Sequence, residues 1–264
     1  MSGRAAIRGE QIAFSQEGSG DIDLVLIHGF QNDRTAWQPF VDRLDKSRFR
    51  VVAFDLVGCG ESSTPAEWTR CTIDEYAADL VALCNQLELS APIVVGHSLG
   101  GATALRSALN APDRFGALVL VAPASTTGLD FLPEDQFDTL RNPTVAQQRA
   151  LARAAFRHPP SDDQFEELMA VIARASPQHI EGAARSMRDF VCIGELDALV
   201  PPALLVCGDR DRHVPLRNLL ATQQAIPRCG LQVYFDVGHV PFVETPDSFV
   251  VDVGRFFETA VAAH

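Results

Sequence analysis

The chain has 264 residues, 47% of them hydrophobic and 21% charged, a composition typical of a soluble globular protein with a sizeable core. Its formal net charge of −12 at pH 7 argues against a nucleic acid or an anionic membrane as a partner. The apolar stretches are too short for a signal peptide or a membrane span. The six cysteines are scattered without a C-x-x-C pair, which favours reduced thiols and a cytoplasmic location.

Short apolar runs recur along the chain, and each is bounded by Gly, Pro or Asp. They are continuous rather than alternating, which is typical of strands buried on both faces of a parallel sheet. Helix-like segments lie between them, at 72–87, 99–110 and 248–259. The alternation predicts an α/β fold with helices on both sides of the sheet. The runs are Leu24–Ile27, Val51–Phe54, Ile93–Val95, Ala117–Val121, Ala203–Val206 and Leu231–Phe235.

One region, 125–199, breaks this alternation. It contains no convincing strand but four helix-like patches, at 133–141, 144–157, 161–175 and 177–190, which prolines separate. We therefore predict a core domain of residues 1–124 and 200–264 with a helical cap inserted at 125–199. Such a cap covers the strand ends, where ligands of α/β proteins bind. The predicted pocket residues are His28, Trp37, Phe131, Phe137, Phe156 and Met187.

The stretch GHSLG, residues 96–100, follows one apolar run and precedes a helix-like segment. A G-x-S-x-G pattern between a strand and a helix is typical of a nucleophile elbow. The serine there has a strained backbone, and strand and helix approach so closely that only glycine fits two residues to either side. We predict that Ser98 is a nucleophile at a helix N-terminus, where free N–H groups favour negative charge.

A serine hydroxyl needs a base to remove its proton, and the chain has seven histidines. His239 follows the last apolar run, in a loop at the same carboxyl edge of the predicted sheet as Ser98. We predict that His239 is the base, the alternative being a structural loop histidine. His97 adjoins the serine, and we expect the elbow to point it away in a structural or supporting role.

The base needs a carboxylate that fixes its tautomer and stabilises the imidazolium. Two candidates, Asp209 and Asp211, follow the run that ends at Val206. Asp211 lies further into the loop and is the predicted acid. Asp209 is expected to cap its own turn.

An oxyanion hole requires two free N–H groups beside the nucleophile. One is predicted at Leu99, directly after Ser98, and the second at Phe30, in the loop after the first apolar run. Gly29 lets the backbone turn there. We expect His28 to brace this loop by hydrogen bonds, the alternative being a second base.

Five motifs, in this order and spacing, resemble those of the α/β-hydrolase superfamily over about residues 10–260. They are LVLIHGF, VVAFDLVGCGESS, PIVVGHSLGGATAL, LLVCGDRDRHVP and VGHVPFVETPDSF. The chain order Ser98, Asp211, His239 also distinguishes this superfamily from the two best-known protease arrangements. The resemblance implies an eight-stranded, mostly parallel sheet, a helical lid at about 125–199 and the triad predicted above.

The resemblance leaves the reaction open. Haloalkane dehalogenases and epoxide hydrolases of this fold use an aspartate nucleophile, and this chain has Ser98 instead. The elbow is similar to that of hydrolases that cleave carbon–carbon bonds. Their wider glycine-rich oxyanion loop and the tryptophan shortly after the catalytic histidine are absent. Val57 and Cys59 also depart from the common pattern, and Cys59 is expected to alter a pocket wall or a loop hydrogen bond.

The first hypothesis is a serine hydrolase that cleaves a carboxylic ester or lactone of a small, mostly apolar substrate through an acyl-enzyme. The second keeps the triad in a carbon–carbon hydrolase or cofactor-free lyase that acts on a 1,3-dicarbonyl-type metabolite. A third is a ligand-sensing protein with a slow triad. In each case we expect a small-molecule partner, no cofactor and no metal, with a monomer and a homodimer both open.

Overall fold

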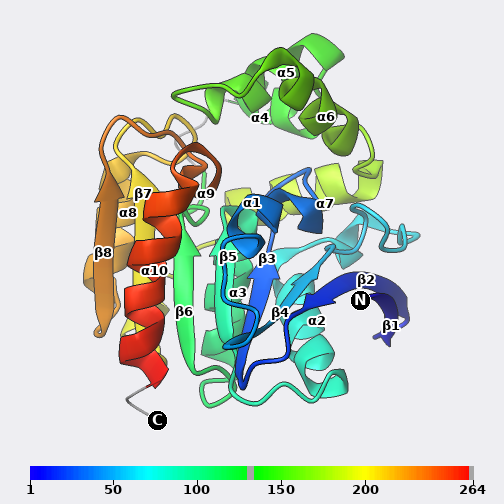
Figure 1. Cartoon of the computed structure of the whole chain (residues 1–264). Coiled ribbons are helices and arrows are strands. Elements are labelled where there is room, and N and C mark those ends of the chain that lie inside the picture. The colour runs from blue at the N-terminus through cyan, green and yellow to red at the C-terminus, as the bar shows by residue number, and fades with distance from the viewer. Residues whose placement is uncertain (130–133, 262–264) are drawn as a thin grey trace.

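One eight-stranded sheet forms the centre of the structure, a computed structural model that describes residues 1–129 and 134–261 (Figure 1). The strand order is β1-β2-β4-β3-β5-β6-β7-β8. Strand β2 pairs antiparallel with β1 and β4, and the other neighbouring pairs are parallel. The predicted α/β fold with a mostly parallel eight-stranded sheet is therefore confirmed. The strands are β1 (Ser2–Ile7), β2 (Glu10–Glu17), β3 (Ile22–Ile27), β4 (Phe49–Phe54), β5 (Ile93–His97), β6 (Ala117–Val121), β7 (Ala203–Gly208) and β8 (Cys229–Tyr234).

The six apolar runs of the sequence form β3 to β8. The runs of β3 to β7 are continuous because both faces of these strands are covered. The expectation of burial on both faces is wrong for β8, an edge strand in which Leu231 and Val233 are exposed. In β3, Val25 and Ile27 pack into one core cluster, whereas Leu24 and Leu26 pack into another. All four side chains are fully buried.

The apolar runs did not reveal β1 and β2, a hairpin at the edge of the sheet. In β1 the buried residues Ala5 and Ile7 alternate with exposed neighbours. Because one face of this hairpin meets water, no continuous apolar run marks it. The turn is made at Arg8 and Gly9, both with positive φ.

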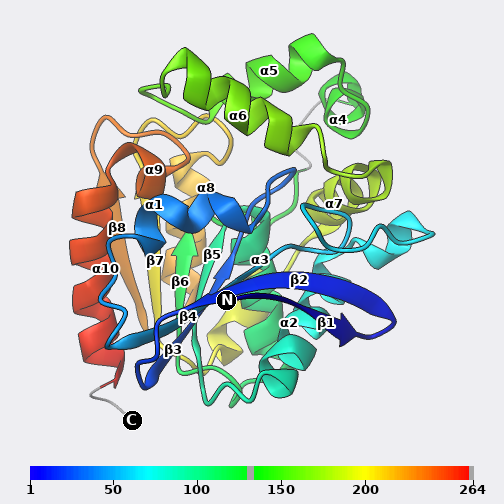
Figure 2. The same cartoon turned by 45° about the vertical axis from the view of Figure 1, so that its right-hand side comes forward.

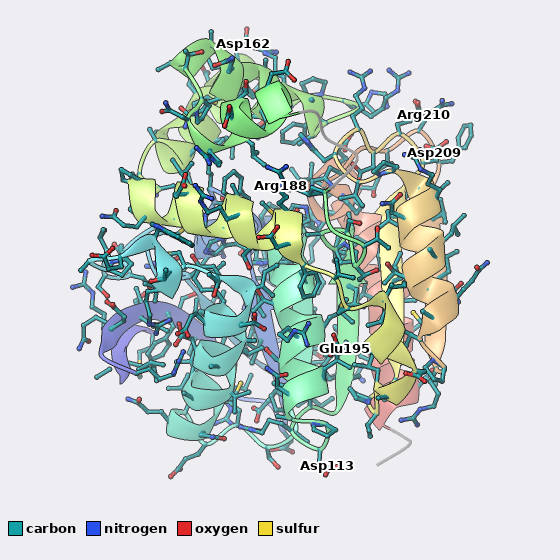
Figure 3. The ribbon with its side chains drawn as sticks, turned by 180° about the vertical axis from the view of Figure 1, so that it is seen from behind. Asp113, Asp162, Arg188, Glu195, Asp209 and Arg210 are labelled. Atoms are coloured by element: carbon teal, nitrogen blue, oxygen red, sulfur yellow. The ribbon has the colours of Figure 1, made fainter. Side chains whose placement is uncertain are left out.

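Helices cover both faces of the sheet. Helices α2 (Ile73–Gln86), α3 (Leu99–Asn110) and α8 (Leu216–Ala225) lie on one face, which Figure 3 shows from the front. Helices α1 (Gln38–Val41) and α10 (Pro246–Val261) lie on the other. Shorter elements are α9 (Pro241–Glu244) and the 3₁₀ turns η1 (Arg34–Trp37), η2 (Trp68–Arg70) and η3 (Ile193–Ala198).

Among the described residues between β6 and β7 lie four α-helices, and we call the segment from α4 to α7, with its connecting loops, the helical insertion. They are α4 (Glu134–Arg141), α5 (Val145–Ala154), α6 (Asp162–Ile172) and α7 (Pro177–Asp189). Helices α4 to α6 lie across the carboxyl edge of the sheet, and α7 lies lower, against η2 (Figures 1 and 2). Each corresponds to one predicted helical patch, while the division into two domains remains a prediction.

No helix within residues 1–129 and 134–261 combines the length and the apolar character that crossing a membrane requires.

Candidate active site

Ser98 lies at the turn between β5 and α3, at the carboxyl edge of the sheet. Its backbone has φ 53° and ψ −114°, a conformation that residues other than glycine rarely adopt. Hydrogen bonds hold it there: Ser98 N–H donates to Val121 O at 2.9 Å, and Ser98 O accepts from Ala124 N–H at 2.9 Å. A strained backbone that its surroundings fix in this way is typical of a functional site.

The glycines around Ser98 are required by close backbone contacts. A Cβ at Gly96 would lie 2.3 Å from Gly100 O, and a Cβ at Gly100 would lie 2.4 Å from Ile27 O. A Cβ at Gly101 would lie 2.9 Å from Pro123 Cα. Because the obstructing atoms belong to the backbone, they cannot rotate away as a side chain could. The crowding inferred from the sequence motif is therefore present in the structure.

His239 lies in the loop between β8 and α9, and it lines the same cavity as Ser98. Its Nδ1 is 2.7 Å from Asp211 Oδ2, and both side chains are buried. An ionised carboxylate can only accept a hydrogen bond, so Nδ1 carries the proton. This tautomer leaves Nε2 as the acceptor that a catalytic base needs.

Asp211 is fixed by its own loop. Its Oδ1 accepts the N–H groups of His213 at 2.7 Å and Val214 at 3.0 Å. Burial acts to raise the pKa of Asp211, but the charge and hydrogen bond of His239, together with those N–H groups, hold the pKa below its ordinary value. The side chain is therefore a carboxylate at neutral pH.

Asp209, the other acid considered from the sequence, directly follows β7 and has a different partner. Its Oδ1 accepts the N–H of Asp236 at 2.6 Å. Asp209 thus holds the loop after β8. The prediction from the sequence that it caps its own turn is wrong. Figure 3 shows Asp209 and Arg210 together at the top of β7.

His97 supports the loop that carries His239. Its Nε2 donates to His239 O at 3.0 Å, and the two ring centroids are 4.7 Å apart. Burial lowers the pKa of His97 well below its ordinary value, so the ring is neutral. The sequence predicted a supporting role for His97 but contained no signal for this partner.

The loop after β3 carries Phe30, which lines the cavity beside Ser98. Within the described parts of the chain, neither Phe30 N–H nor Leu99 N–H donates a backbone hydrogen bond. Leu99 N–H is free because it belongs to the first turn of α3. A Cβ at Gly29 would lie 2.8 Å from His97 Nδ1, so this loop approaches the elbow closely. Two free donors near the nucleophile are what an oxyanion hole requires.

His28 braces this loop from below. Its Nε2 accepts Leu56 N–H at 3.0 Å, and its Nδ1–H donates to Gly29 O at 2.8 Å. Burial lowers its pKa, and the side chain is almost fully buried. Both ring nitrogens are used in structural bonds, which makes His28 a brace and not a second base.

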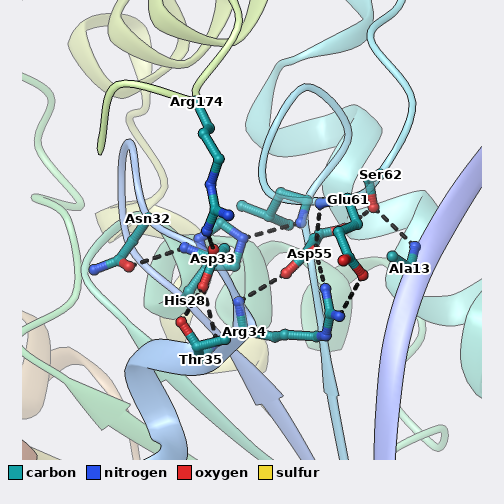
Figure 4. Close-up of polar contacts among 11 residues, drawn as sticks. Ala13, His28, Asn32, Asp33, Arg34, Thr35, Asp55, Glu61, Ser62 and Arg174 are labelled. Atoms are coloured by element: carbon teal, nitrogen blue, oxygen red, sulfur yellow. Dashed lines mark hydrogen bonds and ion pairs between the residues drawn. The ribbon is translucent and has the colours of Figure 1, made fainter. Parts of the chain in front are cut away.

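A polar network joins the loop after β3 to distant segments (Figure 4). Arg34 makes an ion pair with the buried Asp55 and a second with Glu61 at 2.6 Å. Asp33 accepts Thr35 N–H at 2.9 Å and pairs with Arg174, of the helical insertion, at 2.6 Å. The loop is therefore tied both to the segment after β4 and to the insertion.

The insertion also contacts the loop that carries His239. Ala155 O, just after α5, accepts His239 N–H at 2.7 Å. Glu244 Oε2 accepts the N–H groups of Arg157 at 2.9 Å and His158 at 2.8 Å. Both functional loops are thus hydrogen-bonded to the insertion.

A cavity of about 1080 Å³ lies between the insertion and the sheet edge. Of the predicted pocket residues, Phe156 and Met187 line it. Trp37 was predicted wrongly: it is fully buried and stacks on Phe242, with ring centroids 4.3 Å apart. His28 was also predicted wrongly, because both of its nitrogens are engaged beneath the loop. Phe131 lies outside the described residues, and the structure describes only the backbone of Phe137, in α4.

Two further residues near the site are His213, whose role was not predicted from the sequence, and Cys59. His213 lines the cavity with its ring centroid 5.0 Å from that of His239, and burial lowers its pKa to about 4. Cys59 is buried and forms no pocket wall. In its loop, Cys59 N–H donates to Leu56 O at 2.9 Å and Cys59 O accepts Ser62 N–H at 3.0 Å, and burial raises the pKa of its thiol. Among the described residues, no cluster of three His, Cys, Asp or Glu side chains could hold a metal ion.

A serine at a strained strand–helix turn, beside a buried Asp–His pair and under an inserted set of helices, defines a hydrolase-type enzyme on an α/β scaffold. The family model for the alpha/beta hydrolase fold matches residues 24–246, and the chain belongs to that family.

Relatives of this chain include hydrolases of two kinds. It is 30% identical over 254 residues to a pimeloyl-[acyl-carrier protein] methyl ester esterase of Aliivibrio salmonicida, covering 92% of this chain and 94% of the relative. It is 31% identical over 254 residues to a 2-hydroxymuconate semialdehyde hydrolase of Pseudomonas sp., covering 91% and 88%. The solved structure of an esterase from Exiguobacterium antarcticum shares the fold, with TM-score 0.91, 21% identity and coverage of 98% and 100%.

Proposed function

We propose that the chain hydrolyses carboxylic esters or lactones, with Ser98 as nucleophile, His239 as base and Asp211 as the acid that orients the base. The observation that carries the proposal is the 2.7 Å bond from His239 Nδ1 to Asp211 Oδ2, with His239 and Ser98 lining one cavity. The relative named as a methyl ester esterase supports the same chemistry.

The reaction has two halves. Ser98 Oγ attacks the carbonyl carbon while His239 Nε2 takes the hydroxyl proton, and the carbonyl oxygen becomes an oxyanion that accepts from Phe30 and Leu99 N–H. His239 then gives the proton to the leaving oxygen, the C–O bond breaks and the acyl group stays on Ser98. In the second half, His239 takes a proton from water, the hydroxide attacks the acyl carbon, and the acid leaves as Ser98 regains its proton.

The cavity supports a substrate larger than an acetyl ester. Its volume of about 1080 Å³ slightly exceeds the roughly 300–1,000 Å³ of typical ligand pockets. Its side chains are mainly apolar and include Phe156, Leu168 and Met187, with amide groups such as Gln147 between them. We therefore propose a mostly apolar acyl or alcohol group of medium length.

A series of p-nitrophenyl esters, from acetate to octanoate, tests the proposal. The wild type should hydrolyse them with a preference for the medium chains, and Ser98→Ala should abolish turnover. Asp211→Asn should lower kcat by about 10⁴-fold, because the His239 tautomer is no longer fixed. Ser125→Ala is the matched control. This serine also lines the cavity but has no role in the proposed reaction, so its loss should change kcat only a few-fold. A Ser98→Ala enzyme with undiminished turnover contradicts the proposal.

A second candidate, hydrolysis of a carbon–carbon bond, is favoured by the 31% identity to the 2-hydroxymuconate semialdehyde hydrolase. Ser98 and His239 would then act on a ketone of a 1,3-dicarbonyl-type metabolite, and the departing carbon would take the proton. Assaying 2-hydroxymuconate semialdehyde and a 1,3-diketone beside the esters separates the candidates. A kcat/KM for either of these carbonyl compounds far above that for the best ester would favour the second candidate.

We also propose a cytoplasmic protein with a core of residues 1–124 and 200–264 and a cap of 125–199. The six free cysteines, five of them buried, support a reducing environment. The position of α4 to α6 over the sheet edge supports the division.

A further inference from the structure

His179, in the first turn of α7, is a buried histidine that the proposed reaction does not use. Its Nε2 accepts the N–H of Gln31, the residue after Phe30, at 3.1 Å. Its Nδ1 must then carry the proton, and it donates to Tyr76 Oη at 2.8 Å. Tyr76 in turn donates to Val57 O at 3.0 Å. The His179 ring therefore connects the loop after β3 to the core through three successive hydrogen bonds. In each of them the donor and acceptor assigned are consistent with the next bond.

The backbone that His179 holds is itself strained. Gln31 has φ 55°, in the left-handed region that favours glycine. Such a conformation persists only where neighbouring groups hold it. His179 contacts the residue on each side of the peptide: it accepts the Gln31 N–H, and its ring stacks on Phe30 with centroids 5.4 Å apart and 27° between planes.

Helix α7 reaches this loop because glycine and capping residues let it approach. A Cβ at Gly58, which has φ +86°, would lie 2.9 Å from His179 Cβ. Ser176 N–H donates to Gly58 O at 2.8 Å, and Ser176 Oγ accepts His179 N–H at 3.1 Å. Burial lowers the pKa of His179 to about 3, so the ring is neutral and can accept at any working pH.

We propose that His179 is a positioning residue: by accepting the Gln31 N–H and stacking on Phe30, it holds the loop so that Phe30 N–H stays free and directed at the substrate oxyanion. The inference rests on the proposed function, since it requires Phe30 to form the oxyanion hole. It assigns to the helical insertion a part in catalysis besides shaping the cavity.

Three variants test the role. His179→Phe keeps a ring against Phe30 but removes both polar contacts. His179→Gln restores an amide oxygen near the Nε2 position, whereas His179→Asn reaches only as far as Nδ1. Ser186→Ala is the matched control, because Ser186 Oγ joins α7 to the core by accepting Ile73 N–H at 2.8 Å without touching the loop.

The readouts are kcat and KM for the best ester, the Kd of phenylboronic acid, which forms a tetrahedral adduct on the serine, and Tm. We expect His179→Phe and His179→Asn to lower kcat about 10- to 100-fold with little change in KM. The reason is that a displaced Phe30 N–H stabilises the oxyanion of the transition state less, while substrate binding is unaffected. Their boronate Kd should rise in parallel. His179→Gln should recover most of both, and Ser186→Ala should lower Tm alone.

A His179→Phe enzyme with unchanged kcat and boronate affinity overturns the inference. So does a series in which kcat follows Tm through all variants, including Ser186→Ala, because that pattern marks a purely structural residue. If His179→Phe does not fold, the Gln and Asn variants decide by the same two criteria. An active Ser98→Ala enzyme would instead overturn the proposed function, so the two failures are distinguishable.

Discussion

The predicted nucleophile elbow and the loop after β3 border the same cavity, but they are held by different means. The elbow is fixed by close contacts within the sheet: Gly96 lies against Gly100, Gly100 against the end of β3, and Ser98 is hydrogen-bonded to the end of β6. The loop is fixed by residues 28, 141 and 148 positions away in the chain, at Leu56, Arg174 and His179. The predicted nucleophile is therefore held by the strands of the sheet, whereas the predicted oxyanion donor also depends on how the insertion packs.

The largest expected effect comes from adding one methyl group at the elbow. Gly100→Ala places a Cβ 2.4 Å from Ile27 O, and neither backbone can move without displacing a central strand. We expect a loss of more than about 3 kcal/mol in the free energy of unfolding, with no activity. Urea unfolding measures it. The control Gly254→Ala, where a Cβ meets nothing within 4 Å in α10, should stabilise by up to about 1 kcal/mol. Equal stability of the two variants would contradict a sterically fixed elbow.

A smaller effect is expected where α7 contacts the core, at Gly58, and it tests whether the loop after β3 depends on the insertion. Gly58→Ala combines a positive φ with a Cβ 2.9 Å from His179 Cβ, so we expect a loss of about 2 kcal/mol together with lowered kcat. Gly9→Ala has φ +90° but no atom within 4 Å, so it isolates the cost of the backbone, roughly 1 kcal/mol, with unchanged kcat. If both variants lower kcat alike, displacement of His179 is not the cause.

The burial of His179 of the insertion should also be visible in the pH dependence of the free energy of unfolding. The pKa of His179 is about 3 in the folded chain and about 6.5 when unfolded, so the unfolded state binds more protons between these values. The free energy of unfolding therefore falls on acidification by up to about 1.4 kcal/mol per pH unit. His213, with a pKa of about 4, acts in the same direction. His179→Gln should flatten the curve between pH 4.5 and 6.5 in urea titrations, and an unchanged slope would speak against a buried neutral His179.

The smallest effect is expected at the ion pair between Arg174 and Asp33. The Arg174–Asp33 pair joins a 54% exposed arginine to a buried carboxylate that keeps its bond from Thr35 N–H. Screening by water limits its worth, so Arg174→Ala should cost less than about 1 kcal/mol and lower kcat at most a few-fold. Arg149→Ala, which breaks the exposed pair with Glu166 elsewhere in the insertion, is the control for kcat. A larger kcat effect for Arg174→Ala than for His179→Phe would reverse the order of importance of the two contacts.

Features that depend on neighbouring residues could be predicted from the sequence. The apolar runs predicted β3 to β7 because strands buried on both faces need continuous apolar residues. The motif around Ser98 predicted its crowding because small residues at fixed positions mark a close approach of strand and helix, although the atoms that crowd Gly100 belong to β3. The hairpin of β1 and β2 could not be predicted in this way, since neither strand is buried on both faces, and in the edge strand β1 water on one face gives an alternating pattern.

The partners of single side chains were harder to predict. Trp37 was placed in the pocket from its position near the loop, but an aromatic side chain gives no sign of which face it packs on, and here it stacks on Phe242. The stretch around His179 carries no motif, because the atoms it binds belong to a loop 148 residues earlier in the chain. By contrast, the pairing of Asp211 with His239 could be predicted, because parallel strands bring their following loops to one edge.

The hydrogen bonds from Ala155 O to His239 N–H and from His179 to Gln31 N–H bear on how this enzyme can be re-engineered. A foreign set of helices grafted between β6 and β7 would have to present an acceptor at both places, or the grafted protein would fold with a disordered reaction centre. New substrate ranges are therefore more accessible by exchanging cavity side chains of α5 and α6, such as Leu151 and Leu168, than by replacing the insertion as a module.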